Sequence, residues 1–212
     1  MIRTFGAVAL LAVSLLSSTA VHAQSWEDGT HYRTLDNPVR TASDEGVEVA
    51  EVFWYGCPHC YNFKPLAESY EENAPDYVNY VRLPAALGRS WEPHAYAFYA
   101  LEAMDELSQD VHDGLFEALA GERRPLNDAE SLADFVAQYG VDAEEFVSTY
   151  NSFGVRARVQ QAQAKIRGAR ITGTPTMLVD GKYVTSASMA GGHENVVRVV
   201  EYLVERENSA AE

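Results

Sequence analysis

Apolar runs typical of buried strands occur in the first half of the chain. Residues 47–55 (VEVAEVFWY) are rich in β-branched and aromatic side chains and predict a central strand, and residues 77–83 predict the next one. A shorter strand is expected over residues 31–35. Between the two longer strands, apolar residues recur at three- and four-residue spacing, which predicts a helix from about Cys57 to about Glu72.

The strand pattern returns near the C-terminus. Residues 176–179 and 182–185 predict two strands, and Asp180-Gly181 between them is a strong hairpin signal. Two consecutive glycines then precede a final helix over residues 193–206. Its expected apolar face consists of Val196, Val197, Val200, Leu203 and Val204.

The middle of the chain has a helical pattern without a repeat. Helices are expected over 92–104, 111–120, 127–139, from Asp142 onward, and over 155–167, with Asn127 to Glu130 as a capping box. Strands at both ends and helices between them indicate an α/β domain that carries an inserted all-helical domain. We place the insertion at residues 87–165, which leaves residues 24–86 and 166–212 for the α/β domain.

The first 23 residues have the features of a secretory signal. Arg3 precedes an apolar core, and Val21-His22-Ala23 is a small-residue cleavage site, so we expect export and cleavage after Ala23. An uncleaved anchor is the alternative. The formal net charge of −15 argues against nucleic acid or an anionic membrane surface as a partner.

The only two cysteines lie in the motif Cys57-Pro58-His59-Cys60, where the strand pattern gives way to a helix. At a helix N-terminus, unpaired N–H groups favour a thiolate at Cys57, and Pro58 costs no hydrogen bond in the first turn. His59 can add a donor or positive charge near the sulfur. Cys60 lies one turn further on and can attack a mixed disulfide on Cys57. These four candidate catalytic residues predict thiol-disulfide exchange through a redox-active disulfide.

Three other uses of this motif are weaker. A structural zinc site needs about four ligands, and no second cysteine pair exists to supply them. A c-type haem site needs histidine directly after the second cysteine, where this chain has Tyr61. A purely structural disulfide that closes so short a loop would constrain little of the unfolded chain.

Several motifs together resemble the DsbA family of periplasmic thiol:disulfide oxidoreductases. They are the run FWYGCPHCYNF around the cysteines, an acid at Glu51, Gly173-Thr174-Pro175-Thr176, NSF at 151–153 and VDGKY at 179–183. The resemblance covers nearly the whole chain after the signal segment. It implies a thioredoxin fold with an inserted helical domain.

The resemblance also implies roles for three residues outside the cysteine motif. Thr174 and Pro175 correspond to the family's cis-proline site, where the backbone binds an extended substrate segment. Glu51 would lie beneath the cysteines and relay the proton of Cys60. The alternative for Glu51 is a residue at a strand end that reaches solvent.

The expected function is that of a monomeric dithiol oxidase in the periplasm of a Gram-negative bacterium. It would donate its disulfide to unfolded or partly folded exported proteins with free thiols, and the resemblance implies that a DsbB-like inner-membrane protein reoxidises it. No metal, nucleotide or flavin is needed. A disulfide reductase or isomerase is one alternative, and a chaperone without enzymatic activity is another.

Overall fold

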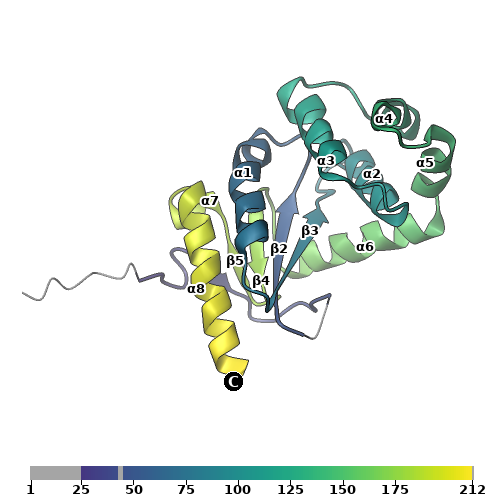
Figure 1. The fold of residues 1–212 in the computed structure, drawn as a ribbon. Coiled ribbons are helices and arrows are strands. Elements are labelled where there is room, and N and C mark those ends of the chain that lie inside the picture. The colour runs from purple at the N-terminus through teal and green to yellow at the C-terminus, as the bar shows by residue number, and fades with distance from the viewer. Residues whose placement is uncertain (1–24, 43–44, 212) are drawn as a thin grey trace, which may run out of the picture.

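The computed structural model describes residues 25–42 and 45–211 (Figure 1). The signal segment predicted for residues 1–23 lies outside these ranges. The described residues form a five-stranded mixed sheet in the order β1-β5-β4-β2-β3. The strands are β1 (Arg33–Thr34), β2 (Val47–Phe53), β3 (Val78–Pro84), β4 (Thr176–Val179) and β5 (Tyr183–Thr185).

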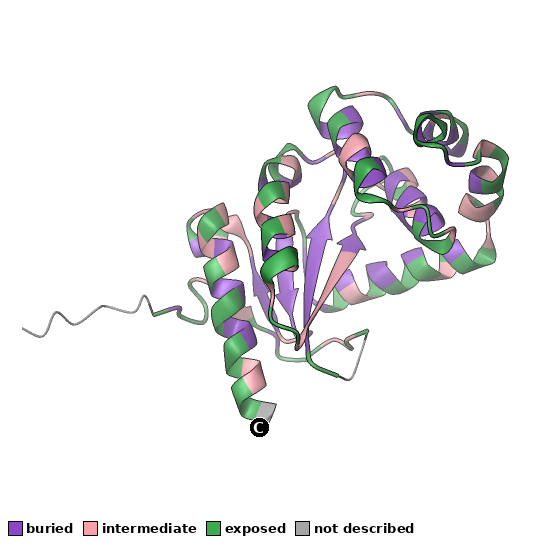
Figure 2. Cartoon of the chain, in the orientation of Figure 1, coloured by how far each residue is buried: buried purple, intermediate pink, exposed green. Residues whose placement is uncertain are grey.

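The inner strand β2 organises the sheet. It pairs in parallel with β3 and antiparallel with β4, and all seven of its residues are buried, as Figure 2 shows. Burial on both faces explains its continuous apolar pattern. The strand ends at Phe53, two residues before the predicted end. The first strand is reduced to Arg33 and Thr34 because its only partner in the sheet, β5, has three residues.

Two helices cover one face of the sheet. Helix α1 (Pro58–Asn73) continues through Pro65, and α8 (His193–Ala211) packs beside it over β2 and β4 (Figure 1). The buried face of α8 includes Val199, whereas the predicted Val197 is only partly buried. A short helix that was not predicted, α7 (Ala187–Ala190), precedes α8.

The helical insertion lies beyond β3, the strand at one edge of the sheet (Figure 1). It contains α2 (Glu92–Ala103), α3 (Gln109–Phe116), a π-helical turn (Glu117–Gly121), α4 (Ala129–Val136), a 3-10 turn (Ala137–Tyr139), α5 (Ala143–Tyr150) and most of α6 (Phe153–Gly168). Helix α6 runs without interruption through residue 166 and carries the chain back to the sheet. The residue boundaries of the two domains stay a prediction.

The caps of two insertion helices differ from the sequence-based prediction. The capping box predicted for Asn127 and Glu130 is formed one position later. Asp128 has extended backbone angles and accepts the N–H of Ser131 at 2.8 Å, and the Ser131 hydroxyl oxygen accepts the N–H of Asp128. Helix α6 begins two residues earlier than predicted because the hydroxyl of Ser152 accepts the N–H of Val155.

The predicted turn between β4 and β5 is confirmed. Asp180 and Gly181 are the central residues of a turn in which the N–H of Lys182 donates to the carbonyl oxygen of Val179 at 2.9 Å, and both have positive φ angles, 50° and 61°. Strand β5 begins at Tyr183, one residue after the predicted start. A Cβ atom at Gly181 would lie 2.0 Å from the carbonyl oxygen of Val39, so only glycine fits there. In the part of the chain that the structure describes, no helix is both long and apolar enough to cross a membrane.

Candidate active site

The two cysteines lie at the start of α1, shortly after the end of β2. Cys57 is the N-cap of α1, and its Sγ accepts a hydrogen bond from the backbone N–H of Cys60 at 3.4 Å. Both cysteines are free thiols and both are buried, with exposed fractions of 7% and 0%. Pro58 and His59 occupy the exposed first turn between them. The predicted helix start at Cys57 is therefore confirmed.

The two thiols differ strongly in acidity. A hydrogen bond from the Cys60 thiol, aided by Thr174 and by the backbone N–H groups of Cys60 and His59, lowers the pKa of Cys57 to about 5. Partial burial opposes this shift without cancelling it. Burial, together with the hydrogen bond to Cys57 and its charge, raises the pKa of Cys60 far above its ordinary value. Near neutral pH the reduced site therefore holds a thiolate at Cys57 and a thiol at Cys60.

The loop before β4 reaches the cysteines from the distant end of the chain. The Thr174–Pro175 peptide bond is cis, as predicted, and the carbonyl oxygen of Thr174 lies 3.5 Å from the Sγ of Cys57. The Thr174 hydroxyl is buried and has no hydrogen-bond partner among the described residues. Thr176 donates to the carbonyl oxygen of Gly173 at 2.8 Å and holds the loop in place. Residues separated by 117 positions thus form one site.

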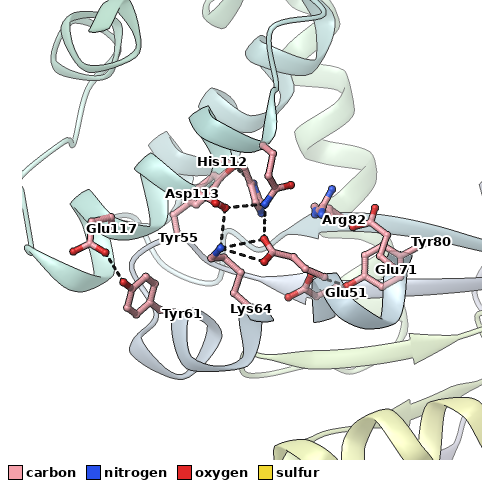
Figure 3. Close-up of polar contacts among 12 residues, drawn as sticks. Glu51, Tyr55, Tyr61, Lys64, Glu71, Tyr80, Arg82, His112, Asp113 and Glu117 are labelled. Carbon is pink, nitrogen blue, oxygen red and sulfur yellow. Dashed lines mark hydrogen bonds and ion pairs between the residues drawn. The ribbon is translucent and has the colours of Figure 1, made fainter. Parts of the chain in front are cut away.

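Glu51 is buried, with 5% exposure, so it does not reach solvent from a strand end. Its carboxylate accepts a hydrogen bond from the hydroxyl of Tyr80 at 2.8 Å, and burial raises its pKa to about 7 (Figure 3). Arg82, the neighbour of Glu51 on β3, forms an ion pair with Glu71 of α1. Within the described residues, neither cysteine is hydrogen-bonded to Glu51.

A second polar cluster ties α1 to the insertion. Lys64 of α1 forms an ion pair with Asp113 of α3 at 2.8 Å, as Figure 3 shows. It forms another with Glu68 at 3.1 Å. Tyr61 donates to Glu117 in the π-helical turn. These contacts fix the helix that carries the cysteines against the helical insertion.

The aromatic residues beside the motif play different parts. Tyr55 and Phe63 belong to the core, with 1% exposure each, whereas Trp54 and Tyr61 are partly exposed. The ring of Trp54 stacks on Trp91 at a centroid distance of 4.2 Å. Sequence reasoning did not find this pair, because 37 residues separate two aromatics that no local pattern connects.

The histidine at position 94 has a non-local role that its sequence context did not reveal. The indole N–H of Trp54 donates to Nδ1 of His94 at 2.7 Å, and Nε2 of His94 lies 2.9 Å from the carbonyl oxygen of Leu126. This pattern requires a neutral ring with the proton on Nε2. Burial lowers the pKa of His94 and favours the same neutral state. His94 therefore fixes the orientation of an aromatic ring next to the cysteines.

No three His, Cys, Asp or Glu side chains in the described ranges gather so that they could hold a metal ion. A free C-x-x-C pair at a helix N-terminus, facing a cis-proline loop that leads into an inner strand of a mixed sheet, defines an oxidoreductase of the thioredoxin fold that exchanges thiols and disulfides.

Comparisons with known proteins agree with this class. Residues 78–204 match the family model of the DSBA-like thioredoxin domain. The thiol:disulfide interchange protein DsbA of Pseudomonas aeruginosa is 41% identical over 203 residues, which cover 96% of each chain. The DsbA of Azotobacter vinelandii is 36% identical over 95% of this chain and 96% of the relative.

Solved structures give the same result. The crystal structure of Pseudomonas aeruginosa DsbA superposes with a TM-score of 0.85 at 42% identity, and it covers 89% of this chain and 98% of that one. The oxidoreductase DsbA of Xylella fastidiosa gives a TM-score of 0.80 at 32% identity, over 86% and 98% of the two chains. The chain belongs to the DsbA family of thiol:disulfide interchange proteins. The predictions of a thioredoxin fold with a helical insertion and of a dithiol oxidase are confirmed.

Proposed function

We propose that Cys57 and Cys60 are the redox-active pair with which this enzyme donates a disulfide to exported proteins. The observation that carries the proposal is the opposite shift of the two pKa values, to about 5 for Cys57 and far upward for Cys60. A stabilised Cys57 thiolate favours the reduced form of the enzyme. An enzyme whose reduced form is stabilised is a strong oxidant.

The reaction follows from this asymmetry. A substrate thiolate attacks the Sγ of Cys57 in the oxidised enzyme, the Cys57–Cys60 bond breaks, and Cys60 leaves and takes up a proton. A second substrate thiolate then attacks the substrate sulfur of the mixed disulfide. Cys57 leaves as a thiolate, which its low pKa favours, and the substrate disulfide forms. Two electrons pass from the substrate to the enzyme.

Thr174 and Pro175 are proposed to bind the substrate beside the reacting sulfur. The carbonyl oxygen of Thr174 already lies 3.5 Å from Cys57, so an extended segment that pairs with this loop would present its cysteine to Cys57. Pro58 starts α1 without the loss of a hydrogen bond. His59 lies exposed in the same turn, where its ring can meet the incoming segment.

Glu51 is proposed as the proton relay for Cys60. A carboxyl group with a pKa of about 7 exchanges its proton readily near neutral pH. The hydroxyl of Tyr80 holds the carboxylate in place and keeps its pKa from rising further. The relay would deliver a proton to Cys60 when that residue leaves as a thiolate.

The cellular setting is inferred from the sequence and the family. We propose that residues 1–23 direct export, that cleavage follows Ala23, and that the mature protein works in the periplasm as a monomer on substrates with free thiols. A DsbB-like inner-membrane protein would reoxidise the Cys57–Cys60 pair. Residues 24–86 and 166–212 would form the thioredoxin-like domain, with residues 87–165 inserted.

The roles of the cysteines can be tested with two variants and a reduced, unfolded protein as the substrate. Wild type in its oxidised form should form disulfides in this substrate. With a substrate that has one activated thiol, Cys60→Ser should accumulate a mixed disulfide, because neither Cys60 nor a second substrate thiolate is present to resolve it, whereas Cys57→Ser should neither oxidise nor trap. A mixed disulfide on Cys60 in the Cys57→Ser variant would contradict the assignment. Binding of substrate that survives in Cys57→Ser without any oxidation by wild type would indicate a chaperone.

A further inference from the structure

A groove beside the cis-proline loop differs in charge from the rest of the protein. It encloses about 540 Å³ between this loop, β5 and α7, and it reaches His59 in the active-site turn. In Figure 1, α7 lies at the same end of the sheet as the start of α1. The groove is lined by Thr174, whose carbonyl oxygen lies 3.5 Å from the Sγ of Cys57, and it continues from this loop along the surface on which a substrate segment would lie.

Every titratable side chain that lines this groove is a base. They are Arg33, His59, Arg170 and His193, and no Asp or Glu is among the lining residues. The chain as a whole carries 31 acidic residues against 16 lysines and arginines. A groove whose titratable lining residues are all bases is thus a local exception in an acidic protein, which points to an occupant with negative charge.

The two arginines are available to a ligand. The guanidinium of Arg33 donates to the carbonyl oxygen of Ala169 at 3.0 Å, which fixes its head beside the loop, and it has no ion-pair partner among the described residues. Arg170 lies 3.7 Å from Asp36, but both side chains are largely exposed, at 70% and 80%. Such a pair is weak and can be replaced by a better placed carboxylate.

The backbone of the loop is also open. The N–H groups of Thr172 and Gly173 donate to no described residue, and the segment belongs to no strand. An extended peptide can therefore pair with the loop and run along the groove. Adjacent residues of an extended chain are about 3.3 Å apart, so a side chain a few positions from the reacting cysteine would reach the arginines.

We propose that Arg33 and Arg170 determine specificity, and that the groove binds a substrate segment with Asp or Glu a few residues from its reacting cysteine. This inference rests on the proposed function, because it assumes that the substrate cysteine is attacked at Cys57. The net charge of −15 acts against the binding of acidic segments, since the overall field of the protein repels acidic peptides. A preference for acidic peptides would therefore report the groove rather than the overall charge.

The test uses the oxidised full-length protein and peptides with one cysteine. The peptides carry Asp-Asp, Asn-Asn or Lys-Lys three residues before the cysteine in one set and three residues after it in another. In excess peptide, two peptide thiols become one peptide disulfide and the protein disulfide becomes two thiols. The second-order rate of this reduction is followed by tryptophan fluorescence at low and high salt.

The Asp peptide of one set should react about threefold faster than its Asn counterpart at low salt, and the difference should vanish in about 1 M salt. The double variant Arg33→Gln, Arg170→Gln should lose the preference. Arg170→Gln alone, at an exposed position, should reduce it without affecting folding. Arg156→Gln removes an exposed arginine at the far end of α6 and should retain it.

Equal rates for Asp and Asn peptides in both sets, or faster reaction of the Lys peptides, would overturn the inference. Loss of the preference in Arg156→Gln would also overturn it, because the effect would then follow total charge. If no peptide reduces the oxidised wild type, the proposed function itself fails. The two failures are therefore distinguishable.

Discussion

The backbone N–H of Cys60 lies 3.4 Å from the Sγ of Cys57, one helical turn away. Because this N–H is one of the donors that a helix N-terminus leaves unpaired, the negative charge of a thiolate compensates it. The same turn buries Cys60 completely. A single local structure therefore makes one cysteine acidic and places it against the cis-proline loop, while it keeps the other protonated.

Alkylation of the reduced protein should report this difference. The rate of reaction of Cys57 with iodoacetamide should rise with a midpoint near pH 5 instead of the ordinary value of 9.0, and Cys60 should stay unlabelled. Cys60→Ala should move the midpoint upward, because the largest cause of the low pKa is the hydrogen bond from the Cys60 thiol. Cys60→Ser retains a donor and should move it less. Labelling of Cys60 before Cys57 would disprove the prediction.

Glu51 should make the stability of the oxidised protein depend on pH. Its pKa is about 7 in the folded protein and 4.5 ordinarily, so the folded state binds more protons between these values, and stability should fall as pH rises from about 4.5 to 7. Glu51→Gln should remove this dependence and should be more stable than wild type above pH 7, by about 3 kcal/mol. Urea unfolding of the oxidised protein at several pH values measures both.

Two variants serve as controls for the Glu51 prediction. Tyr80→Phe removes a hydrogen bond that lowers the pKa of Glu51, so the loss of stability should extend to pH values above 7. Glu72→Gln changes an exposed carboxyl group of α1 and should preserve the dependence of wild type. If Glu51→Gln follows the wild-type pH curve, the carboxyl group does not titrate in this range.

Gly56→Ala should destabilise the protein through the neighbouring indole ring. A Cβ atom at this position would lie 2.4 Å from Cζ2 of Trp54, whose indole is held by His94 and stacked on Trp91. Displacing that ring should cost about 1–3 kcal/mol and change tryptophan fluorescence.

The matched control for this substitution is Gly154→Ala in the first turn of α6. An added Cβ there meets only the Ser152 hydroxyl oxygen at 3.9 Å, and alanine is a better helix former than glycine. We expect unchanged or slightly increased stability. Equal effects of the two substitutions on the free energy of unfolding in urea would show that the ring of Trp54 can move aside without loss of stability.

Some of the site was evident from the sequence because its causes are local. The start of α1 at Cys57, Pro58 in its first turn and the hairpin at Asp180-Gly181 each depend on a few consecutive residues, and the structure has all three. The burial of β2 could be predicted as well, since only a strand covered on both faces has so continuous an apolar pattern.

The burial and the partner of Glu51 were decided by the tertiary structure. The register of the sheet places Glu51 between Arg82 on β3 and Met177 on β4. Its hydrogen bond to Tyr80 depends on the same register, because the two residues come from different strands. The sequence alone left open whether this carboxylate reached solvent.

The amino-acid sequence alone was enough to predict the helix that activates Cys57, because helix caps and strand ends depend on neighbouring residues. Only the tertiary structure decided what surrounds the sulfur. Thr174 reaches Cys57 across 117 residues, and His94 reaches Trp54 across 40. Contacts of this kind depend on how the sheet closes and how the insertion packs against it. They are stabilised by packing and hydrogen bonds between segments that are distant in the sequence, and no local sequence pattern predicts such contacts.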